Sequence, residues 1–205
     1  MTLFDAAESV FLAKGYHAAT MNEVAKAAGM SKKTVYALIE SKADLFSSML
    51  AHHHSLLKFP EPQPDWTPQE ILTSHLLTLA RFLLSPPQIA ILRLIMAEYT
   101  HSPDFTRMFV RKRVIKAKAK LEAHLNDLAL NHGFCVPDAK EFSAMLFGMA
   151  IGEFHLGILV GFRSPPSKQA LEARVRHAVE IFCTGCGPAA TTPRLPTCGG
   201  PTPRG

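Results

Sequence analysis

Apolar residues recur along most of the chain at the three- and four-residue spacing of helices, and the alternation typical of strands is nearly absent. In residues 3–14, this spacing places Phe4, Ala7 and Phe11 on one face. Gly15 then ends the predicted helix, since glycine commonly follows a helix C-terminus. The pattern therefore predicts an all-α protein.

Two short helices joined by a glycine turn are predicted at residues 20–39. Thr20 and Glu23 have the spacing of a capping box, which starts a helix. Gly29 ends it, because glycine adopts the left-handed backbone at no steric cost, and Ser31 is a good N-cap for the next helix. This arrangement is a helix-turn-helix, which is typical of proteins that read DNA in the major groove.

The second helix of this pair carries candidate DNA-contacting side chains. Its pattern predicts that Val35 and Leu38 face inward and leaves a polar face outside. Lysine can meet phosphates or guanine edges, threonine can contact a base edge or a thymine methyl, and helix N-termini favour phosphates. The predicted DNA-binding residues are Thr20, Ser31, Lys32, Lys33, Thr34, Tyr36 and Lys42.

Caps and prolines divide the rest of the chain into further helices. One helix is expected from Lys42 to about Lys58, and the four prolines of FPEPQPDWTP at residues 59–68 predict a domain junction. Five more helices are predicted at residues 67–84, 86–101, 103–132, 137–162 and 168–182. The expected parts are a helix-turn-helix domain at residues 1–58, the junction at 59–68, a second helical domain at 69–185, and a Pro- and Gly-rich disordered tail at 186–205.

Four short motifs follow one another in the first part of the chain. They are DAAESVFLAKGY at 5–16, T-M-x-E-V-A-x-A-A-G-M-S at 20–31, K-x-T-V-Y at 32–36 and K-x-D-L-F at 42–46. Their order and spacing, from Ala6 to Leu50, resemble the DNA-binding domain of the tetracycline-repressor (TetR) family of bacterial regulators. Residues 88–162, with RLIMAEYTHSPDFTRMF, are similar in a looser way to the AefR-like C-terminal domain of some members.

The chain departs from this family pattern in two places. Members usually carry a short basic arm before the first helix, whereas here Met1 and Thr2 run directly into Leu3. The second helix of the pair usually ends with bulky aromatic residues, whereas here Ala37 and Ile39 occupy those positions. Contacts made by such an arm or by such an aromatic residue are therefore not expected.

The resemblance implies an all-helical transcriptional regulator that acts as a homodimer and binds operator double-stranded DNA through its N-terminal domain. It also implies a C-terminal bundle that dimerises through its last two helices. A small-molecule effector would release the repressor by favouring a state with a different spacing of the two DNA readers. An activator, or a regulator without a ligand, is the alternative within this class. From another class, the alternative is a helical enzyme or metal-binding protein with an incidental basic helix.

Two further sets of residues follow from these implications. The helices between Thr67 and His132 would enclose a ligand pocket. Each residue proposed to line this pocket could equally be a core residue. Their mainly apolar and aromatic character suggests an apolar or aromatic effector. The candidate pocket residues are Trp66, Leu77, Arg81, Met96, Tyr99, Met108, Phe109 and Phe147. Four small residues in the helix predicted at 137–162 would allow another helix to approach closely, and we assign them to the dimer interface. The alternative is that they allow tight packing inside one subunit. They are Ala144, Gly148, Gly152 and Gly157.

Charge changes this picture little. The net charge of +5 and the pI near 9.1 favour polyanionic partners. The first 58 residues hold six Lys against five Asp or Glu, so the predicted helix-turn-helix domain is nearly neutral overall. Its positive charge is therefore concentrated in one part of the domain. A basic run at residues 107–120 falls all round its predicted helix, which is typical of a solvated helix rather than of a second polyanion-binding surface.

Histidine and cysteine residues cluster without the spacing of a metal site. The three consecutive histidines at 52–54 point about 100° apart on a helix, so they cannot converge on one ion. Cys183 and Cys186, with Cys198 further on, could hold a metal or form a redox pair, but no fourth ligand is evident. We therefore expect no metal.

The chain lacks a nucleophile–base–oxyanion set and a phosphate-binding glycine loop, so we expect neither an enzyme nor a cofactor. No signal peptide is recognisable. The apolar run from Met145 to Phe162 is interrupted by four glycines and by Glu153 and His155, which argues against a membrane span. A cytoplasmic protein without a membrane partner is expected.

Overall fold

The computed structural model describes residues 2–101 and 119–187 of the chain. All regular secondary structure in these two ranges is helical, which confirms the expected fold class. The candidates outside the described residues are Met108, Phe109, Cys198, the basic run up to residue 118, and residues 188–205 of the predicted tail.

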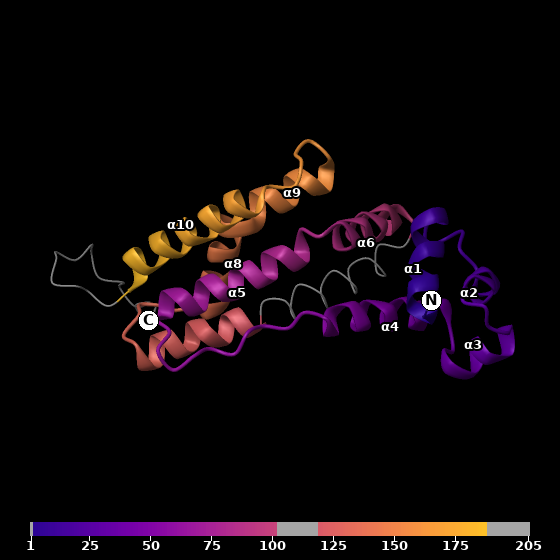
Figure 1. The fold of residues 1–205 in the computed structure, drawn as a ribbon, viewed down its shortest axis with the longest axis horizontal. Helices are drawn as coiled ribbons and strands as arrows, with labels where there is room; N and C mark the ends of the chain where they lie inside the picture. The colour runs from indigo at the N-terminus through magenta and orange to yellow at the C-terminus, as the bar shows by residue number, and fades with distance from the viewer. Residues whose placement is uncertain (1, 102–118, 188–205) are drawn as a thin grey trace, which may run out of the picture.

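The N-terminal end consists of α1 (Leu3–Lys14), α2 (Met21–Ala27) and α3 (Lys32–Leu38), and α4 (Lys42–Ser55) leads from them toward the opposite end (Figure 1). α1 and α4 pack together through the fully buried Phe11 and Phe46, whose ring centroids lie 5.3 Å apart in an edge-to-face contact. This aromatic pair provides the base from which α2 and α3 project.

The core of this end includes a helix from much later in the chain. α6 (Pro86–Ala97) contributes the buried Ile91, Leu94 and Ile95 to the same apolar cluster as α1 and α4. Full burial of an aliphatic side chain contributes about 1.5–3 kcal/mol. The packing of the N-terminal end therefore extends past the proline-rich junction at residues 59–68.

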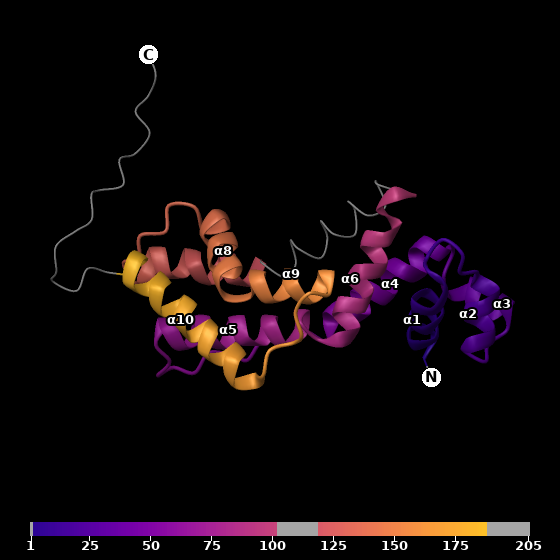
Figure 2. The ribbon, with the colours of Figure 1, turned by 90° about the horizontal axis from the view of Figure 1, so that it is seen from above.

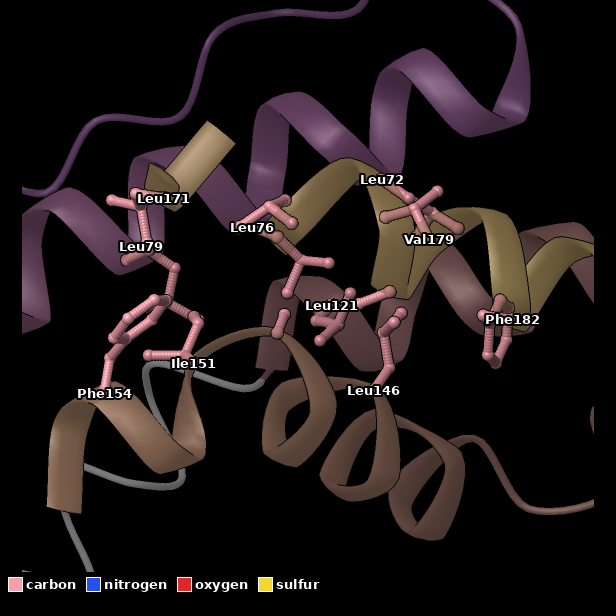
Figure 3. Close-up of a cluster of buried hydrophobic side chains, with 14 of the residues drawn as sticks. Leu72, Leu76, Leu79, Leu121, Leu146, Ile151, Phe154, Leu171, Val179 and Phe182 are labelled. Carbon is pink, nitrogen blue, oxygen red and sulfur yellow. The ribbon is translucent and has the colours of Figure 1, made fainter. Parts of the chain in front are cut away.

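The opposite end is a bundle around a second apolar core. In α5 (Pro68–Leu83), Leu72, Leu76 and Leu79 recur at helical spacing and are fully buried. Figure 3 shows these leucines facing side chains of the neighbouring helices, and Figure 2 shows α10 lying across α5. The other members of the bundle are the helix at residues 119–131, α8 (Ala139–Phe147), η2 (Gly148–Gly152), α9 (Glu153–Val160) and α10 (Lys168–Cys186).

The helix predicted at residues 137–162 is present as a continuous helical stretch made of α8, η2 and α9. Asp138 starts it, because its carboxylate accepts hydrogen bonds from the N–H groups of Lys140 and Glu141 at 2.9 and 3.1 Å. The middle segment η2 is π-helical and so takes a wider turn. This turn rotates the faces of α9 relative to those of α8.

The same stretch, Ala139–Val160, is long and apolar enough to cross a membrane, in contrast to the expectation drawn from its glycines and polar residues. In the fold, Leu146, Ile151 and Phe154 on one side of it are buried in the bundle core (Figure 3). The apolar character of this stretch is thus partly explained by core packing.

Three helix ends differ from their predictions. α4 ends at Ser55 rather than at Lys58, and α6 ends at Ala97 rather than at His101 and is followed by the 3-10 turn η1 (Glu98–Thr100). α10 continues to Cys186, because Phe182 and Cys183 near its end are buried against the bundle. Packing therefore extends this helix through the start of the predicted tail, and Cys186 belongs to the folded bundle.

Candidate nucleic-acid interface

The turn between α2 and α3 is fixed by backbone geometry. Gly29 has a φ of +66°, in the left-handed region that favours glycine, and the N–H of Met30 donates to the carbonyl of Ala25 at 2.9 Å. This hydrogen bond closes α2 in the manner of a Schellman motif. Ser31 then starts α3 by accepting a hydrogen bond from the N–H of Thr34 at 3.0 Å. The caps predicted for this region are present.

α3 presents an almost entirely exposed surface. Val35 is its one buried residue, as predicted, and it anchors the helix in the core of the N-terminal end. Leu38 was predicted to face inward and is instead 62% exposed, so that prediction is wrong. The reason is that α3 ends at Leu38, and the extended backbone of Ile39 turns the Ile39 side chain onto the core instead.

The predicted DNA-binding residues of α3 lie together on this outer surface. The Oγ atoms of Ser31 and Thr34 lie 2.8 Å apart, and the Nζ atom of Lys32 lies 5.7 Å from the centroid of the Tyr36 ring. All four side chains and that of Lys33 are exposed. The helix stands at the far end of the molecule from the bundle (Figure 1), where a DNA groove could reach it.

Thr20 belongs to a polar network at the start of α2. Its N–H and its hydroxyl each donate to the carboxylate of Glu23 at 3.0 Å, and Lys14 donates to the same carboxylate. These contacts, with the Lys14 ammonium first, lower the pKa of Glu23 to about 2. The hydroxyl of Thr20 is therefore engaged in capping while the side chain remains exposed.

Lys42 is the first residue of α4, and its ammonium forms hydrogen bonds within the protein. Nζ donates to the backbone oxygens of Tyr16, His17 and Ala19 at 2.8, 2.9 and 2.9 Å. Burial lowers the pKa of this ammonium, and the charge of Glu98 opposes that effect. The ammonium expected to face a DNA phosphate thus holds the α1–α2 loop, because the loop carbonyls need donors.

Tyr16 packs in the core beside this loop. Its ring centroid lies 5.5 Å from that of Phe11 and 5.1 Å from that of Phe46. Burial raises the pKa of its phenol. The ring also lies beneath the ammonium of Lys42, with 4.7 Å between Nζ and the centroid. The loop is therefore held by both apolar and polar contacts.

Glu98, which follows the last residue of α6, links the loop to this helix. This residue opens the 3-10 turn η1 (Glu98–Thr100) and is only 5% exposed, and its Oε1 accepts from the N–H of His17 at 3.2 Å. The rings of His17 and His101 stack with centroids 5.5 Å apart. Sequence reasoning did not reveal this link, because the two partners are 81 residues apart.

The three consecutive histidines of α4 point to different neighbours. His52 lies against the ring of Phe4, and His53 pairs with Glu8 at 3.0 Å. His54 contributes an edge contact to Phe82. The described residues contain no group of three side chains that could hold a metal ion.

The predicted pocket residues do not share one site in the described part of the chain. Trp66 and Leu77 line an open groove between α5 and α10. Arg81 forms an ion pair with Glu172 at 2.8 Å. The other candidates are dispersed: Met96 and Tyr99 are about half exposed, and Phe147 packs against the bundle core.

A buried histidine that the sequence analysis did not single out marks a different position in the bundle. His75 of α5 is 3% exposed, and no described residue forms a hydrogen bond with its Nε2. Its ring stacks on Phe59 with centroids 4.0 Å apart and meets the edge of His124 at 4.9 Å. Burial lowers the pKa of His75 to about 3, and His124 and Lys120 add to the shift.

A cleft adjoins this position. Phe59 lines the cleft as well as stacking on His75, and the Nζ of Lys120 lies 5.2 Å from the Phe59 ring centroid. The cleft lies between the end of α4, the proline-rich junction and the helix at residues 119–131. Its described lining residues are His54, Leu57, Lys58, Phe59, Glu61, Ala119 and Lys120.

The small residues predicted for the dimer seam fall into two groups. Ala144 and Gly148 are exposed, and a Cβ added at Gly148 or Gly152 would meet nothing within 4 Å in the described chain. Gly157 is buried, and a Cβ there would lie 2.9 Å from the Cβ of Arg163. The assignment of Gly157 to the seam is therefore corrected, because this glycine allows a close approach inside one subunit.

Comparisons with known proteins agree with this geometry. Residues 3–49 match the sequence model of bacterial regulatory proteins of the tetR family, and residues 70–186 match that of the C-terminal domain of AefR-like transcriptional repressors. The chain is 45% identical over 51 residues to the HTH-type transcriptional activator FasR of Mycolicibacterium smegmatis. It is 32% identical over 124 residues to the HTH-type transcriptional regulator YdeS of Bacillus subtilis. These matches cover 25% and 58% of this chain, but only 23% and 61% of the two relatives.

Solved structures show the same fold over nearly the whole chain. The flavonoid-responsive regulator FrrA has a TM-score of 0.73 at 25% identity, with 92% of this chain and 96% of FrrA covered. A TetR-family transcriptional regulator from Mesorhizobium loti has a TM-score of 0.71 at 24% identity, with 90% and 95% covered. The arrangement of a helix-turn-helix end and a helical bundle is therefore shared with these proteins.

Proposed function

The chain belongs to the tetR family of bacterial regulatory proteins, with a C-terminal domain of the AefR-like type, and we propose that it is a homodimeric cytoplasmic repressor released from its operator by a small aromatic molecule. DNA-binding regulation of transcription follows from the family. Members of this family are not enzymes, which removes the alternative of a helical enzyme.

The outer surface of α3 carries the proposal for DNA reading. It exposes Lys32, Lys33 and Thr34 in one turn, while Val35 holds the helix to the core. Lysine and threonine at such positions can contact phosphates and base edges in the major groove. We assign Ser31 and Tyr36, at the ends of this surface, to the DNA backbone or groove wall. Thr20 and the N-terminus of α4 are assigned to phosphates, with the ammonium of Lys42 holding the loop beside them.

An exposed apolar stripe supports the homodimer. Beside Ala144 and Gly148, the side chains of Met145, Leu156 and Val160 are each nearly 60% exposed on the stretch formed by α8, η2 and α9. Such a stripe on a helix is typical of a surface that another subunit covers. Gly152, with open space above it, permits a second helix to approach closely. Pairing there would place two copies of α3 at a fixed spacing for successive major grooves.

His75 and Phe59 support a binding site for an aromatic effector that carries a hydroxyl group. A buried Nε2 without a partner among the described residues favours a ligand that supplies one. Phe59 already stacks on His75 and lies in the cleft, so a planar ligand could take its place. FrrA is flavonoid-responsive, and that property of a similar protein favours the same chemical class here.

The proposed effector site is connected to the DNA reader. Phe59 lies in the segment that joins α4 to α5, and α6 shares the core of the N-terminal end. Displacement of Phe59 would shift the end of α4, while Glu98 and Lys42 tie α6 and α4 to the same loop. Effector binding then lowers the affinity for DNA. The size of this decrease is limited by the ratio of the effector's affinities for the DNA-binding state and the released state.

The main competing function is activation, since the relative FasR is an activator. Selection of genomic DNA fragments by the purified protein, followed by sequencing, would identify the operator. Operator release by hydroxylated aromatic compounds, and loss of that response in His75→Leu, are the expected results. A ligand that strengthens operator binding would favour activation, and the absence of any enriched sequence would overturn the proposed DNA reading.

A further inference from the structure

Two cysteines from distant parts of the chain meet at one end of the bundle. The N–H of Cys135, in the loop after the helix at residues 119–131, donates to the carbonyl oxygen of Cys186 at 2.7 Å. Cys186 is the last residue of α10, and Cys183 lies one turn earlier on the same helix. All three are thiols rather than disulfides in the structure. The sequence analysis paired Cys183 with Cys186, but the backbone contact makes Cys135 a neighbour of Cys186.

This backbone contact limits the distance between the two α-carbons. The N–Cα bond is about 1.46 Å, and a Cα atom lies about 2.4 Å from its own carbonyl oxygen. With 2.7 Å between the nitrogen of Cys135 and the oxygen of Cys186, the two Cα atoms are at most about 6.6 Å apart. Disulfides join Cα atoms that are about 4.4–6.8 Å apart. The separation of the two Cα atoms is therefore below the upper limit for a disulfide.

Solvent access separates the three thiols. Cys135 is exposed and Cys186 is partly exposed, whereas Cys183 is buried. Burial raises the pKa of the Cys183 thiol to about 11, and Cys186 adds to the shift. Because the thiolate is the reactive form, Cys183 is disfavoured as the first thiol to react, and exposure favours Cys135.

We propose that Cys135 and Cys186 are a site of reversible oxidation, at which a peroxide converts the two thiols into one disulfide. The thiolate of Cys135 attacks the peroxide O–O bond, which forms a sulfenic acid and releases hydroxide that takes up a proton to become water. The thiol of Cys186 then attacks the sulfenic sulfur, the S–S bond forms, and a second water leaves. The two sulfurs are oxidised and the peroxide is reduced to two waters.

The bond would close a covalent loop from Cys135 to Cys186. That loop contains α8, η2, α9 and α10, and so it includes the exposed apolar stripe. It would also fix the last turn of α10 to the loop beside α8, where Phe134 packs against the bundle. Reduction by a dithiol would break the disulfide and restore both thiols without any other covalent change.

Tryptic mapping of the oxidised full-length protein tests this proposal. Cleavage places Cys135 in fragment 121–140, Cys183 and Cys186 together in fragment 177–194, and Cys198 in fragment 195–204. After treatment with hydrogen peroxide and blocking of remaining thiols, we expect fragments 121–140 and 177–194 to be linked, and dithiothreitol to separate them. A link to fragment 195–204, or a bond confined to 177–194, would overturn the proposal.

Variants identify which cysteine of the shared fragment reacts. Cys183→Ala should keep the link, because its thiol is buried, and Cys186→Ser should abolish it while circular dichroism shows an unchanged helical fold. Retention of the link in Cys186→Ser would mean that Cys183 is the partner and the proposal is wrong. A non-reducing gel provides the remaining check, since a band at twice the mass of the chain would assign the bond to two subunits instead.

Discussion

Lys42 joins the first turn of α4 to the α1–α2 loop through one ammonium and three carbonyl oxygens. The same loop is also bound by Glu98, at the end of α6. These side chains are polar, yet their role is structural, because each supplies a hydrogen-bond partner for backbone groups of the loop. The exposed face of α3 is different, since its lysines are directed away from the protein.

Lys42→Ala should therefore destabilise the protein rather than only weaken DNA binding. Loss of the three hydrogen bonds leaves carbonyl oxygens of the loop unpaired, which typically costs about 1–3 kcal/mol. Urea denaturation of the intact protein would measure this loss. Lys26→Ala, at an exposed position of α2, is the matched control and should change stability by less than about 0.5 kcal/mol. Equal effects of the two changes would show that the Lys42 ammonium is not a structural link.

His75 gives the protein a defined response to acid. Its folded pKa of about 3 lies below the ordinary value of 6.5, so between these values the unfolded chain binds a proton that the folded chain does not. Stability contributed by this group is complete above pH 6.5 and falls as the pH decreases toward 3. From pH 7 to pH 5, wild type should lose roughly 1–2 kcal/mol more than His75→Leu in urea denaturation. Parallel curves for the two proteins would contradict the assignment.

Sequence reasoning identified the residues of the α3 surface because caps and exposure are local properties. Ser31 was predicted as an N-cap from its place before the helix, and its hydroxyl does accept a hydrogen bond from the N–H of Thr34. The roles of Lys42 and His75 depend on groups brought close by the tertiary fold. No local pattern marks a lysine whose partner carbonyls lie 23 to 26 residues away.

At the scale of elements, helix starts were predicted better than helix ends. Thr67 and Ser167 cap their helices through side-chain contacts three residues apart, which a sequence shows directly. The end of α10 depends instead on the packing of Phe182 and Cys183, and the wide turn of η2 has no local signal. The end of α10 and the wide turn of η2 therefore depend on packing between helices, which the periodicity of the sequence does not predict.

Gly152→Leu tests the exposed stripe on this helical stretch. Open space above Gly152 within the subunit means that the chain should still fold, while the larger side chain meets the second subunit. Overpacking of about 1–3 kcal/mol should raise the dissociation constant of the dimer by about 5- to 150-fold. Sedimentation equilibrium would measure it. A wild-type protein that remains monomeric at micromolar concentration would contradict the proposed seam.

Gly157→Leu is the matched control for this substitution. Its side chain would collide with Arg163 and Phe162 of the same subunit, so we expect a lower Tm and a general loss of folded protein. The contrast between the two glycines separates an effect on association from an effect on folding. Identical behaviour of both variants would mean that the stripe is packed inside one subunit.

At the scale of the whole molecule, the two ends are built around a shared helix. α6 places Ile91 and Ile95 in the core of the DNA-binding end while its residue Ile89 belongs to the bundle core. The proline-rich junction is therefore a clear boundary in the sequence, but the hydrophobic packing continues across it. The effector response that we propose would use this continuity, because a shift of α6 would affect both cores.

A fragment of residues 1–66 should consequently be far less stable than the intact protein. It lacks Ile91, Leu94 and Ile95, each worth about 1.5–3 kcal/mol when buried. Together these losses approach the whole stability of a small domain, about 5–15 kcal/mol. Thermal melting followed by circular dichroism would compare the fragment with the full chain. A fragment that melts within a few degrees of the full chain would show that the reader folds independently of α6.

The central claim is that this protein reads an operator with the outer face of α3, and selection from a randomised DNA library tests it most directly. Wild type should enrich one sequence with two related half-sites, as a dimer requires. Lys33→Ala or Thr34→Ala should relax the preference at particular base pairs, by roughly 1–3 kcal/mol where the contact is direct, while Lys26→Ala leaves it unchanged. An unchanged preference in both α3 variants, or no enriched sequence for wild type, would contradict the account.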